Sequence, residues 1–246
     1  MTKSDIQLIR SLADKKGRAE AGLFLAEGEK LVEEMLASAL EVERVLAVGE
    51  AAERFSGEAI TAQQMARISA LKTPTEVVAL VRIPRHELSV ERLGDRLSLM
   101  LDGVQDPGNM GTILRLADWF GIREVICSPQ SADCFNPKVV QATMGAIARV
   151  RVHYQPLVPL LKTMTAKGIP VYGTFLDGRN IYEARCSARG VIVMGNEGRG
   201  ISEEVARCVT DRLYIPPYPA GKPSSESLNV AVATAIVCAE FRRPGR

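Results

Sequence analysis

Three glycine-rich segments carry side chains and backbone groups that could hold a ligand. They are QDPGNMG (105–111), GNEGRG (195–200) and PPYPAGKPSSES (216–227), and each follows an apolar run. Because glycine has no Cβ, its N–H and C=O groups can approach a ligand closely. The amide of Asn109 can donate and accept hydrogen bonds, and the carboxylate of Glu197 can accept them. Taken singly, each segment could equally be an ordinary turn.

Two common nucleotide-binding motifs are excluded by spacing. The segment GNEGRG (195–200) reads GxxGxG rather than GxGxxG and does not follow the first strand of its domain, so a Rossmann dinucleotide site is not supported. The pair Gly221-Lys222 is followed by Pro223, and Pro216 stands where a phosphate-binding loop needs its first glycine. The sequence therefore argues against both an oxidoreductase of the Rossmann type and a P-loop NTPase.

The segments are positioned by alternating apolar strands and helices. This alternation predicts an α/β domain with a buried, mostly parallel sheet, whose ligands bind beyond the carboxyl ends of the strands. The predicted strands are 97–104, 124–128, 169–176, 190–195 and 212–216, and the predicted helices are 112–121, 136–150, 157–168, 201–208 and 228–241.

The front of the chain predicts a second, smaller α/β domain. A capping box of Ser4 and Gln7 predicts the first helix, and Thr61 predicts the cap of a helix over 60–69. Residues 24–38 are expected to contain a helix, and 42–48 and 76–83 to form strands. A charged, proline-containing stretch follows, so we expect domains at 1–85 and 97–246, joined by a linker at 86–96.

Composition is that of a globular protein of 246 residues, with 46% hydrophobic and 24% charged side chains. No run of about 18 apolar residues predicts a membrane span, and the N-terminus lacks the apolar core of a secretory signal. Five cysteines without a CxxC pair argue against a structural zinc site and for reduced thiols in a cytoplasmic protein. His86 and His153 are too few for an evident metal cluster, so no metal is expected.

The net charge of +2 hides a difference between the two parts of the chain. Residues 1–95 hold 13 basic and 16 acidic side chains, a net of −3, whereas residues 96–246 hold 18 and 13, a net of +5. The basic excess in the second part permits a polyanionic partner.

Three motifs in this order resemble the signature motifs of the SPOUT superfamily of RNA methyltransferases. They are DGVQDPGNMGTILRLADWFG (102–121), VIVMGNEGRGIS (191–202) and IPPYPAGKPSSESLNVAVATA (215–235), and the likeness is greatest to the TrmH (SpoU) branch. That branch methylates ribose 2′-hydroxyls of tRNA or rRNA with S-adenosylmethionine (AdoMet). The segment KGRAEAGLFLAEGEKLVEEML (16–36) also resembles the N-terminal RNA-binding domain of the branch, whose fold occurs in certain ribosomal proteins.

The resemblance implies a C-terminal domain with a deep trefoil knot, an AdoMet site in the knot, and a homodimer through this domain in which each active site is completed by the partner. Residues 216–227 form a longer, more proline-rich segment than the common family form. The cofactor contacts that carry over by motif position, or lie beside such positions, are Thr174, Leu176, Gly195, Asn196, Gly198, Ile215 and Leu228.

Arg115 stands at the position of the family's essential arginine, so the resemblance makes it the first catalytic candidate. Two roles stay open: a general base toward the 2′-hydroxyl, or a cation that holds the adjacent phosphate, which a guanidinium does more readily. Asn109 and Glu197 are further candidates; Glu197 could orient Arg115 or bind substrate. Ser227 and Asn229 flank Leu228, and Ser227 is also a plausible helix cap.

The RNA-binding candidates are basic residues in both parts of the chain. Since the front part is acidic overall, its contact with RNA would depend on a local patch of Lys15, Lys16 and Arg18. Arg199 and Lys222 could contact RNA, or could equally be solvated surface charges. By contrast, Met35, Met65, Trp119, Met144 and Cys238 are expected in the core.

The sequence thus predicts an AdoMet-dependent RNA ribose 2′-O-methyltransferase that acts on rRNA or tRNA. The alternative is a non-catalytic RNA-binding or ribosome-assembly protein of the same fold. The presence of Asn109, Arg115, Glu197, Ser227 and Asn229 favours the enzyme.

Overall fold

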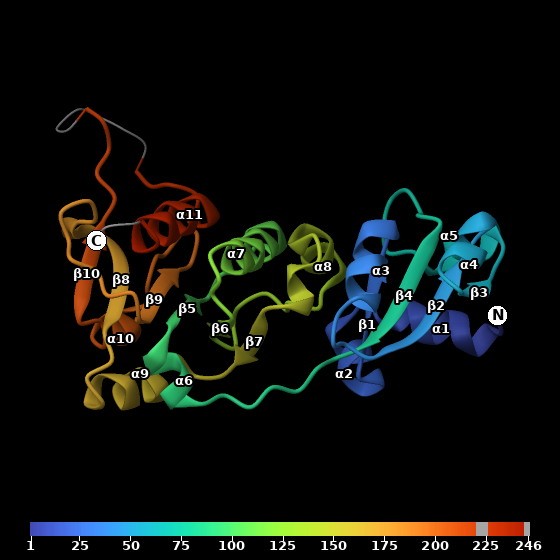
Figure 1. The fold of residues 1–246 in the computed structure, drawn as a ribbon, viewed down its shortest axis with the longest axis horizontal. Coiled ribbons are helices and arrows are strands. Elements are labelled where there is room, and N and C mark those ends of the chain that lie inside the picture. The colour runs from blue at the N-terminus through green and yellow to red at the C-terminus, as the bar shows by residue number, and fades with distance from the viewer. Residues whose placement is uncertain (220–225, 244–246) are drawn as a thin grey trace. The chain divides into compact units, whose positions relative to one another are not determined.

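The computed structural model describes residues 1–219 and 226–243, which fold into two compact units (Figure 1). The first unit is Met1–Arg85 together with Asp133–Arg149, and the second is His86–Ala132 together with Val150–Arg246. The chain therefore leaves the second unit at Asp133, adds a short helical segment to the first, and returns at Val150. The predicted class, an α/β fold with a mostly parallel sheet, is confirmed.

The first unit is built on a four-stranded sheet in the order β1-β4-β2-β3. Its strands are β1 (Leu23–Glu27), β2 (Val42–Ala47), β3 (Glu58–Ala59) and β4 (Val77–Arg82). Strand β4 runs antiparallel to both β1 and β2. All five residues of β1 are buried, because helices cover both faces of the sheet there.

Successive side chains of a strand point to opposite faces, and each face has its own helices. Leu25 and Leu80 pack with Ile9 and Ile68, so helices α1 (Lys3–Ser11) and α5 (Ala62–Ile68) cover one face. On the other face the Phe24 ring lies 4.9 Å from that of Phe135. The remaining helices of the unit are α2 (Lys15–Ala21), α3 (Glu29–Leu36), α4 (Glu50–Arg54), α8 (Pro137–Thr143) and the 3-10 turn η1 (Ala146–Ala148).

The local predictions for this unit are confirmed except for the cap of the first helix. The first helix is capped by Thr2 with Asp5, rather than by Ser4 with Gln7, because the helix begins at Lys3. The helix expected within residues 24–38 is confirmed as α3; residues 24–27 belong to β1, and Gly28, with φ 97°, separates them from the helix. The Thr61 cap of α5 is confirmed, with Gln64 completing its capping box.

The second unit holds a six-stranded sheet in the order β10-β8-β9-β5-β6-β7, in which every pairing is parallel. Its strands are β5 (Leu97–Asp102), β6 (Glu124–Cys127), β7 (Arg151–Tyr154), β8 (Val171–Asn180), β9 (Gly190–Gly195) and β10 (Asp211–Tyr214). Strand order reverses between β5 and β9, which makes the carboxyl ends of these two strands the topological switch point.

Helices cover both faces of this sheet, as a buried parallel sheet requires. Leu93, Leu161 and Met164 pack on Met100 and Val193, so the core of one face involves α6 (Val90–Asp95) and α9 (Leu157–Ala166). On the other face α11 (Val230–Phe241) contacts α7 (Pro107–Trp119) and β9. The short helix α10 (Glu203–Ala206) follows β9. The expected linker is partly helical, because α6 forms within it.

Candidate active site

The first and second motifs meet at the switch point. Asp102, the last residue of β5, is in register with Gly195, the last residue of β9, so the segments that follow these strands leave the sheet side by side. The Asp102 carboxylate also accepts a 2.8 Å hydrogen bond from the N–H of Ser202. A close approach fixes the second segment: a Cβ on Gly195 would lie 2.1 Å from the carbonyl carbon of Gly200.

Glu197 joins these two segments through its carboxylate. Its Oε1 accepts hydrogen bonds from the backbone N–H of Asp106 at 2.9 Å and of Gln105 at 3.2 Å. The same oxygen accepts a 3.2 Å hydrogen bond from Nδ2 of Asn109. Glu197 therefore caps the entrance to α7, and its partners are these groups rather than Arg115, which the sequence left as one option.

The hydrogen bonds keep Glu197 ionised. Partial desolvation raises its pKa, but the N–H groups of Asp106 and of Glu197 itself, the Asn109 amide and the Gln105 N–H lower it more. The pKa of Glu197 thus lies below its usual value, because these donors stabilise the charged form. At neutral pH Glu197 is an acceptor of hydrogen bonds and not a proton donor.

Asn229 links the third motif to the first. Its Nδ2 donates a 2.9 Å hydrogen bond to Oδ1 of Asn109, and its own Oδ1 accepts from the N–H groups of Ala231 and Val232. Asn229 is therefore the N-cap of α11. Of the two roles left open for Ser227, that of helix cap is ruled out, because α11 begins only at Val230; Ser227 is exposed.

The start of α7 lies earlier than the sequence suggested. Asp106 caps the helix by accepting a 2.8 Å hydrogen bond from the N–H of Asn109, and Pro107 occupies its first position. Residues 107–111 are therefore the first turns of a helix and not a glycine-rich loop. The Asp-Pro pair, a cap followed by a proline at the first helical position, was the signal that could have found this start.

Asn196 shapes the second segment from within. Its Oδ1 accepts from the N–H groups of Gly198 and Arg199, both at 3.0 Å, and its Nδ2 donates to the carbonyl of Gly103 at 2.7 Å. Gly103 has φ 74°, a conformation that favours glycine. The side chain of Asn196 is thus engaged in holding the two segments together.

Arg115 points away from this network. It lies six residues after Asn109 on α7, which places it about 9 Å further along the helix and about 120° around it. The side chain is exposed, and within residues 1–219 and 226–243 no ion pair or hydrogen bond of its guanidinium group is seen. Thr112, Arg115 and Trp119 share one exposed stripe of α7, with Trp119 82% exposed.

Apart from Leu228, which precedes α11, the expected cofactor contacts lie in or directly after three neighbouring strands, β8, β9 and β10. Between Arg212 and Leu213 of β10, the partner on β8 shifts from Gly173 to Arg179. Residues 174–178 thus bulge out of the pairing, which leaves Leu176 at 73% exposure. Ile215 follows β10, and Gly195 ends β9.

The side chains near the ends of these strands are compatible with a bound AdoMet molecule. The bulge of β8 is anchored below its tip, since Asp177 pairs with Arg212 at 2.5 Å and Thr174 donates to Sδ of Met194 at 3.7 Å. Leu176 and Leu228 are large apolar side chains left exposed, which suit the adenine and the methionine chain. Gly198, in the segment that follows β9, is exposed and has no side chain to cover its backbone groups.

The RNA-binding candidates divide into exposed and buried residues. Lys15, Lys16 and Arg199 are exposed. Arg18 is only 2% exposed; it pairs with Asp133 at 2.5 Å and donates to the carbonyls of Leu12 and Ala13. The expectation that Arg18 contacts RNA is therefore wrong, because its charge is already neutralised inside the first unit. Lys222 lies outside the described residues.

Among the side chains expected in the core, Met35, Met65 and Cys238 are buried, whereas Trp119 and Met144 are not. Trp119 is the last residue of α7, and Met144 ends α8 in a left-handed conformation with φ 50°. Helical spacing alone could not distinguish these two exposed positions from core positions.

Together the parallel sheet, the switch point and the three linked motifs define a methyltransferase of the SPOUT class. The SpoU rRNA Methylase family model matches residues 96–239, and the MRM3-like substrate binding domain model matches residues 3–79. The chain belongs to the SpoU rRNA methylase family, as the motifs predicted.

Three relatives illustrate the similarity. The 23S rRNA (guanosine(2553)-2'-O)-methyltransferase RlmP of Bacillus subtilis is 33% identical over 95% of this chain and 94% of its own. A protein of the TrmH family of RNA methyltransferases from Porphyromonas gingivalis has a solved structure with 44% identity and a TM-score of 0.87, over 98% of both chains. An AdoMet-bound rRNA methyltransferase from Sinorhizobium meliloti matches with 28% identity and a TM-score of 0.85, over 98% of this chain and 95% of its own.

The described residues also bear on other expectations. They contain no group of three or more His, Cys, Asp or Glu side chains placed to hold a metal ion. No helix within the described ranges is long and apolar enough to cross a membrane. No disulfide joins the five cysteines, all of which lie within the described residues.

Proposed function

We propose that this protein transfers the methyl group of AdoMet to a ribose 2′-hydroxyl of rRNA, with 23S rRNA as the substrate. The observation that carries this proposal is the chain of hydrogen bonds from Glu197 through Asn109 to Asn229, which ties all three motifs together at the switch point. The relatives named for methylation of 23S rRNA support the choice of substrate.

The chemistry asks the protein mainly for position and charge. AdoMet, when bound, would supply a sulfonium methyl group, which is already a good electrophile. Transfer to the ribose oxygen breaks the S–CH3 bond, leaves S-adenosylhomocysteine as the thioether, and releases the hydroxyl proton to solvent. A ribose hydroxyl is a weak nucleophile, so the geometry of the attack matters. Holding its oxygen in line with the methyl group lowers the activation free energy by several kcal/mol, and positioning of two reactants can contribute about 7–11 kcal/mol in all. The network of Glu197, Asn109 and Asn229 fixes the segments that form the site. Asn109, Glu197 and Asn229 therefore act as positioning residues, and Ser227 is a candidate substrate contact beside them.

Arg115 supplies the charge in this proposal. Its guanidinium group is exposed and can bind the phosphate next to the target ribose, since arginine recognises phosphate oxygens with two parallel hydrogen bonds. Acting as a general base would require loss of a proton that guanidinium rarely gives up. We favour the phosphate-binding role for that reason.

We further propose that the protein works as a homodimer through the second unit. Arg115 and Asn109 lie on different sides of α7, so Arg115 does not reach the site that its own Asn109 helps to form. The exposed stripe of Thr112, Arg115 and Trp119 offers an aromatic anchor of the kind found at interfaces. Pairing of this stripe with a second copy would deliver Arg115 to the partner's site.

The family likeness supports three further parts of the proposal. The last segment of the methyltransferase part would thread through a loop to form the trefoil knot, and the Asn229–Asn109 bond that fastens α11 to the first turns of α7 is compatible with it. Residues 1–85 would form an RNA-binding domain, and residues 97–246 would form the methyltransferase domain. Residues 86–96 would link the two. Action on rRNA would place the protein in the cytoplasm.

Methyl transfer in vitro tests the proposal. The full chain is incubated with labelled AdoMet and with unmodified transcripts of 23S rRNA, 16S rRNA and tRNA, and the products are digested to nucleosides. We expect a 2′-O-methylated nucleoside from 23S rRNA alone. Label on a base, or binding of 23S rRNA without any transfer, would overturn the proposal, and the second result would favour the non-catalytic alternative.

A further inference from the structure

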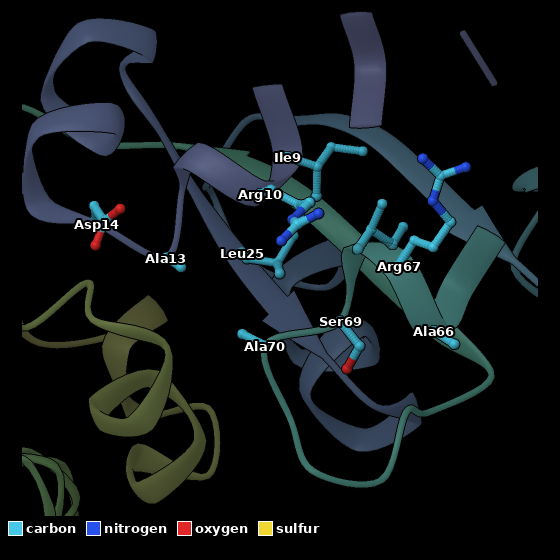
Figure 2. A pocket seen from close by; sticks show the side chains of 10 residues that line it. Ile9, Arg10, Ala13, Asp14, Leu25, Ala66, Arg67, Ser69 and Ala70 are labelled. Carbon is cyan, nitrogen blue, oxygen red and sulfur yellow. The ribbon is translucent and has the colours of Figure 1, made fainter. Parts of the chain in front are cut away.

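The first unit contains a groove of about 500 Å³ between the ends of α1 and α5 (Figure 2). Ile9, Leu25 and Ile68 are buried beneath it and supply apolar lining. The exposed side chains of Ala13 and Ala66 are small and leave the groove open. A volume of this size lies within the range of roughly 300–1,000 Å³ that is typical of ligand sites, and it is larger than one phosphate group requires.

Two arginines line this groove, one from each helix. Arg10 lies in the last turn of α1 and Arg67 in the last turn of α5, and Figure 2 shows both side chains among those that line it. Both are exposed, and neither forms an ion pair within the described part of the chain. Asp14 is the one carboxylate of the lining, so the lining carries a net charge of +1.

Other arginines of the first unit are already engaged with carboxylates. Arg44 pairs with Asp5 and Glu58, Arg54 with Glu29 and Glu33, and Arg82 with Glu41 and Glu43. Arg18 is buried against Asp133. The front of the chain is acidic overall, and its arginines are largely neutralised, but those of the groove keep their charge for a partner.

The wall beside the groove is held from below by a buried carboxylate. Glu27, at the end of β1, accepts a 2.6 Å hydrogen bond from Oγ of Ser69 and a 2.8 Å hydrogen bond from the N–H of Ala70. Both Ser69 and Ala70 line the groove directly after α5. The groove is therefore preformed on this side, which reduces the entropy lost when a ligand binds.

We propose that this groove binds a segment of the substrate RNA, with backbone phosphates on Arg10 and Arg67 and a ribose or base over the apolar lining. The proposal rests on the proposed function, since it takes rRNA as the substrate. It replaces the predicted patch: Arg18 is buried, and Lys15 and Lys16 lie outside the groove lining. Arginine suits this task because its planar fork matches phosphate geometry.

Arginine substitutions in the full chain test whether the positive charges of the groove contribute to RNA binding. The probe is an unmodified 23S rRNA transcript, and its Kd is measured over a series of salt concentrations. We expect Arg10→Ala and Arg67→Ala each to weaken binding about tenfold, and each to reduce the slope of log K against log salt by about 0.7 if the bound segment is single-stranded. Arg54→Ala is the matched control, because it removes the same charge and side chain from an ion-paired site of the same unit.

Two further variants, with one control, test whether RNA occupies the groove without removing a positive charge. Ala66→Trp would fill it and weaken binding, whereas Ala62→Trp, on the same helix but outside the lining, would not. Asp14→Asn would tighten binding, because it removes the one negative charge of the lining. Ala66→Trp binding as tightly as wild type would contradict the proposal.

The proposal for the groove and the proposed function can be tested separately. We expect the Arg10→Ala/Arg67→Ala double variant to raise KM for RNA while kcat at saturating RNA and AdoMet affinity stay at wild-type values. Wild-type affinity and salt slope in the double variant, alongside normal methyl transfer by wild type, would overturn the groove alone. No transfer by wild type, with RNA binding still lost in the double variant, would overturn the proposed function and leave the groove standing.

Discussion

Asn229 donates a 2.9 Å hydrogen bond to Asn109 across 120 residues of sequence, while its own oxygen caps α11. One side chain thus performs two tasks: it starts the last helix, and it fastens that helix to the first turns of α7. Because Asn109 in turn donates to Glu197, the third, first and second motifs are joined in one line.

The two tasks of Asn229 can be separated by substitution. Asn229→Asp keeps a good capping oxygen but replaces the donor to Asn109 with an acceptor, so we expect a melting temperature near wild type and a weakened AdoMet affinity. Asn229→Ala loses both tasks and should also cost about 1 kcal/mol of stability, the usual value of a lost cap. Calorimetry measures both effects. Wild-type AdoMet affinity in Asn229→Asp would show that the link to Asn109 is dispensable.

Glu197 predicts a particular dependence on pH. The pKa of Glu197 in the folded state lies below the unfolded value of 4.5. The stabilisation of the fold by its ionised carboxylate is therefore fully present above pH 4.5 and is lost as pH falls through the folded-state pKa. Glu197→Gln should therefore lower the free energy of unfolding by about 1 kcal/mol at pH 7. The difference from wild type should shrink as pH falls below 4.5. Denaturant titrations at pH 7 and pH 3.5 check this, and an equal difference at both values would contradict the ionised role.

Arg115 is expected to serve the reaction and not the fold, because its exposed guanidinium group forms no hydrogen bond or ion pair within the described residues. Arg115→Ala should keep the melting temperature and AdoMet affinity of wild type but lose at least about 100-fold in kcat, the scale of one lost charge contact to the reacting groups. Arg115→Lys, which keeps the charge but not the planar fork, should recover part of the rate. Near-normal turnover of Arg115→Ala would remove the residue from the mechanism.

Mixing two inactive variants tests whether Arg115 acts on the partner's site. Arg115→Ala and Asn109→Ala homodimers should each be inactive. A heterodimer of the two should regain one complete site, built from Asn109 of one subunit and Arg115 of the other. Activity measured after exchange of subunits would therefore rise well above that of either parent. Failure to rise, with heterodimers present by mass spectrometry, would place both residues in the same subunit's site.

Trp119 provides a separate test of the dimer. Trp119→Glu places a charge in the exposed stripe of α7 and should convert the protein to a monomer at micromolar concentration, with loss of methyl transfer. Sedimentation velocity gives the mass. Leu36→Glu, a change at an exposed apolar residue of the first unit, is the control and should leave the dimer intact.

The motifs and the strand pattern could be predicted from sequence because their signals are local. The strands β5, β6 and β9 are short apolar runs that end at or just before glycine or a polar residue, and the expected parallel sheet is confirmed. The capping residue of α11 was less accessible, because Ser227 and Asn229 are both good caps and only the position of Val230 decides between them.

Features that depend on distant contacts could not be predicted in this way. Arg18 looked like part of a basic patch, but its partner Asp133 lies 115 residues away. The same long-range packing adds residues 133–149 to the first unit, although the chain pattern assigns them to the second. The exposure of Trp119 also follows from where α7 ends on the sheet, which helical spacing does not report.

The most direct test of the central claim is a map of 2′-O-methylated riboses in rRNA from the source cells, with and without the gene. We predict that one methylated ribose of 23S rRNA disappears in the deletion strain and returns with the wild-type gene but not with the Arg115→Ala variant. An unchanged methylation map in a deletion strain that has no second enzyme for the same ribose would contradict the account.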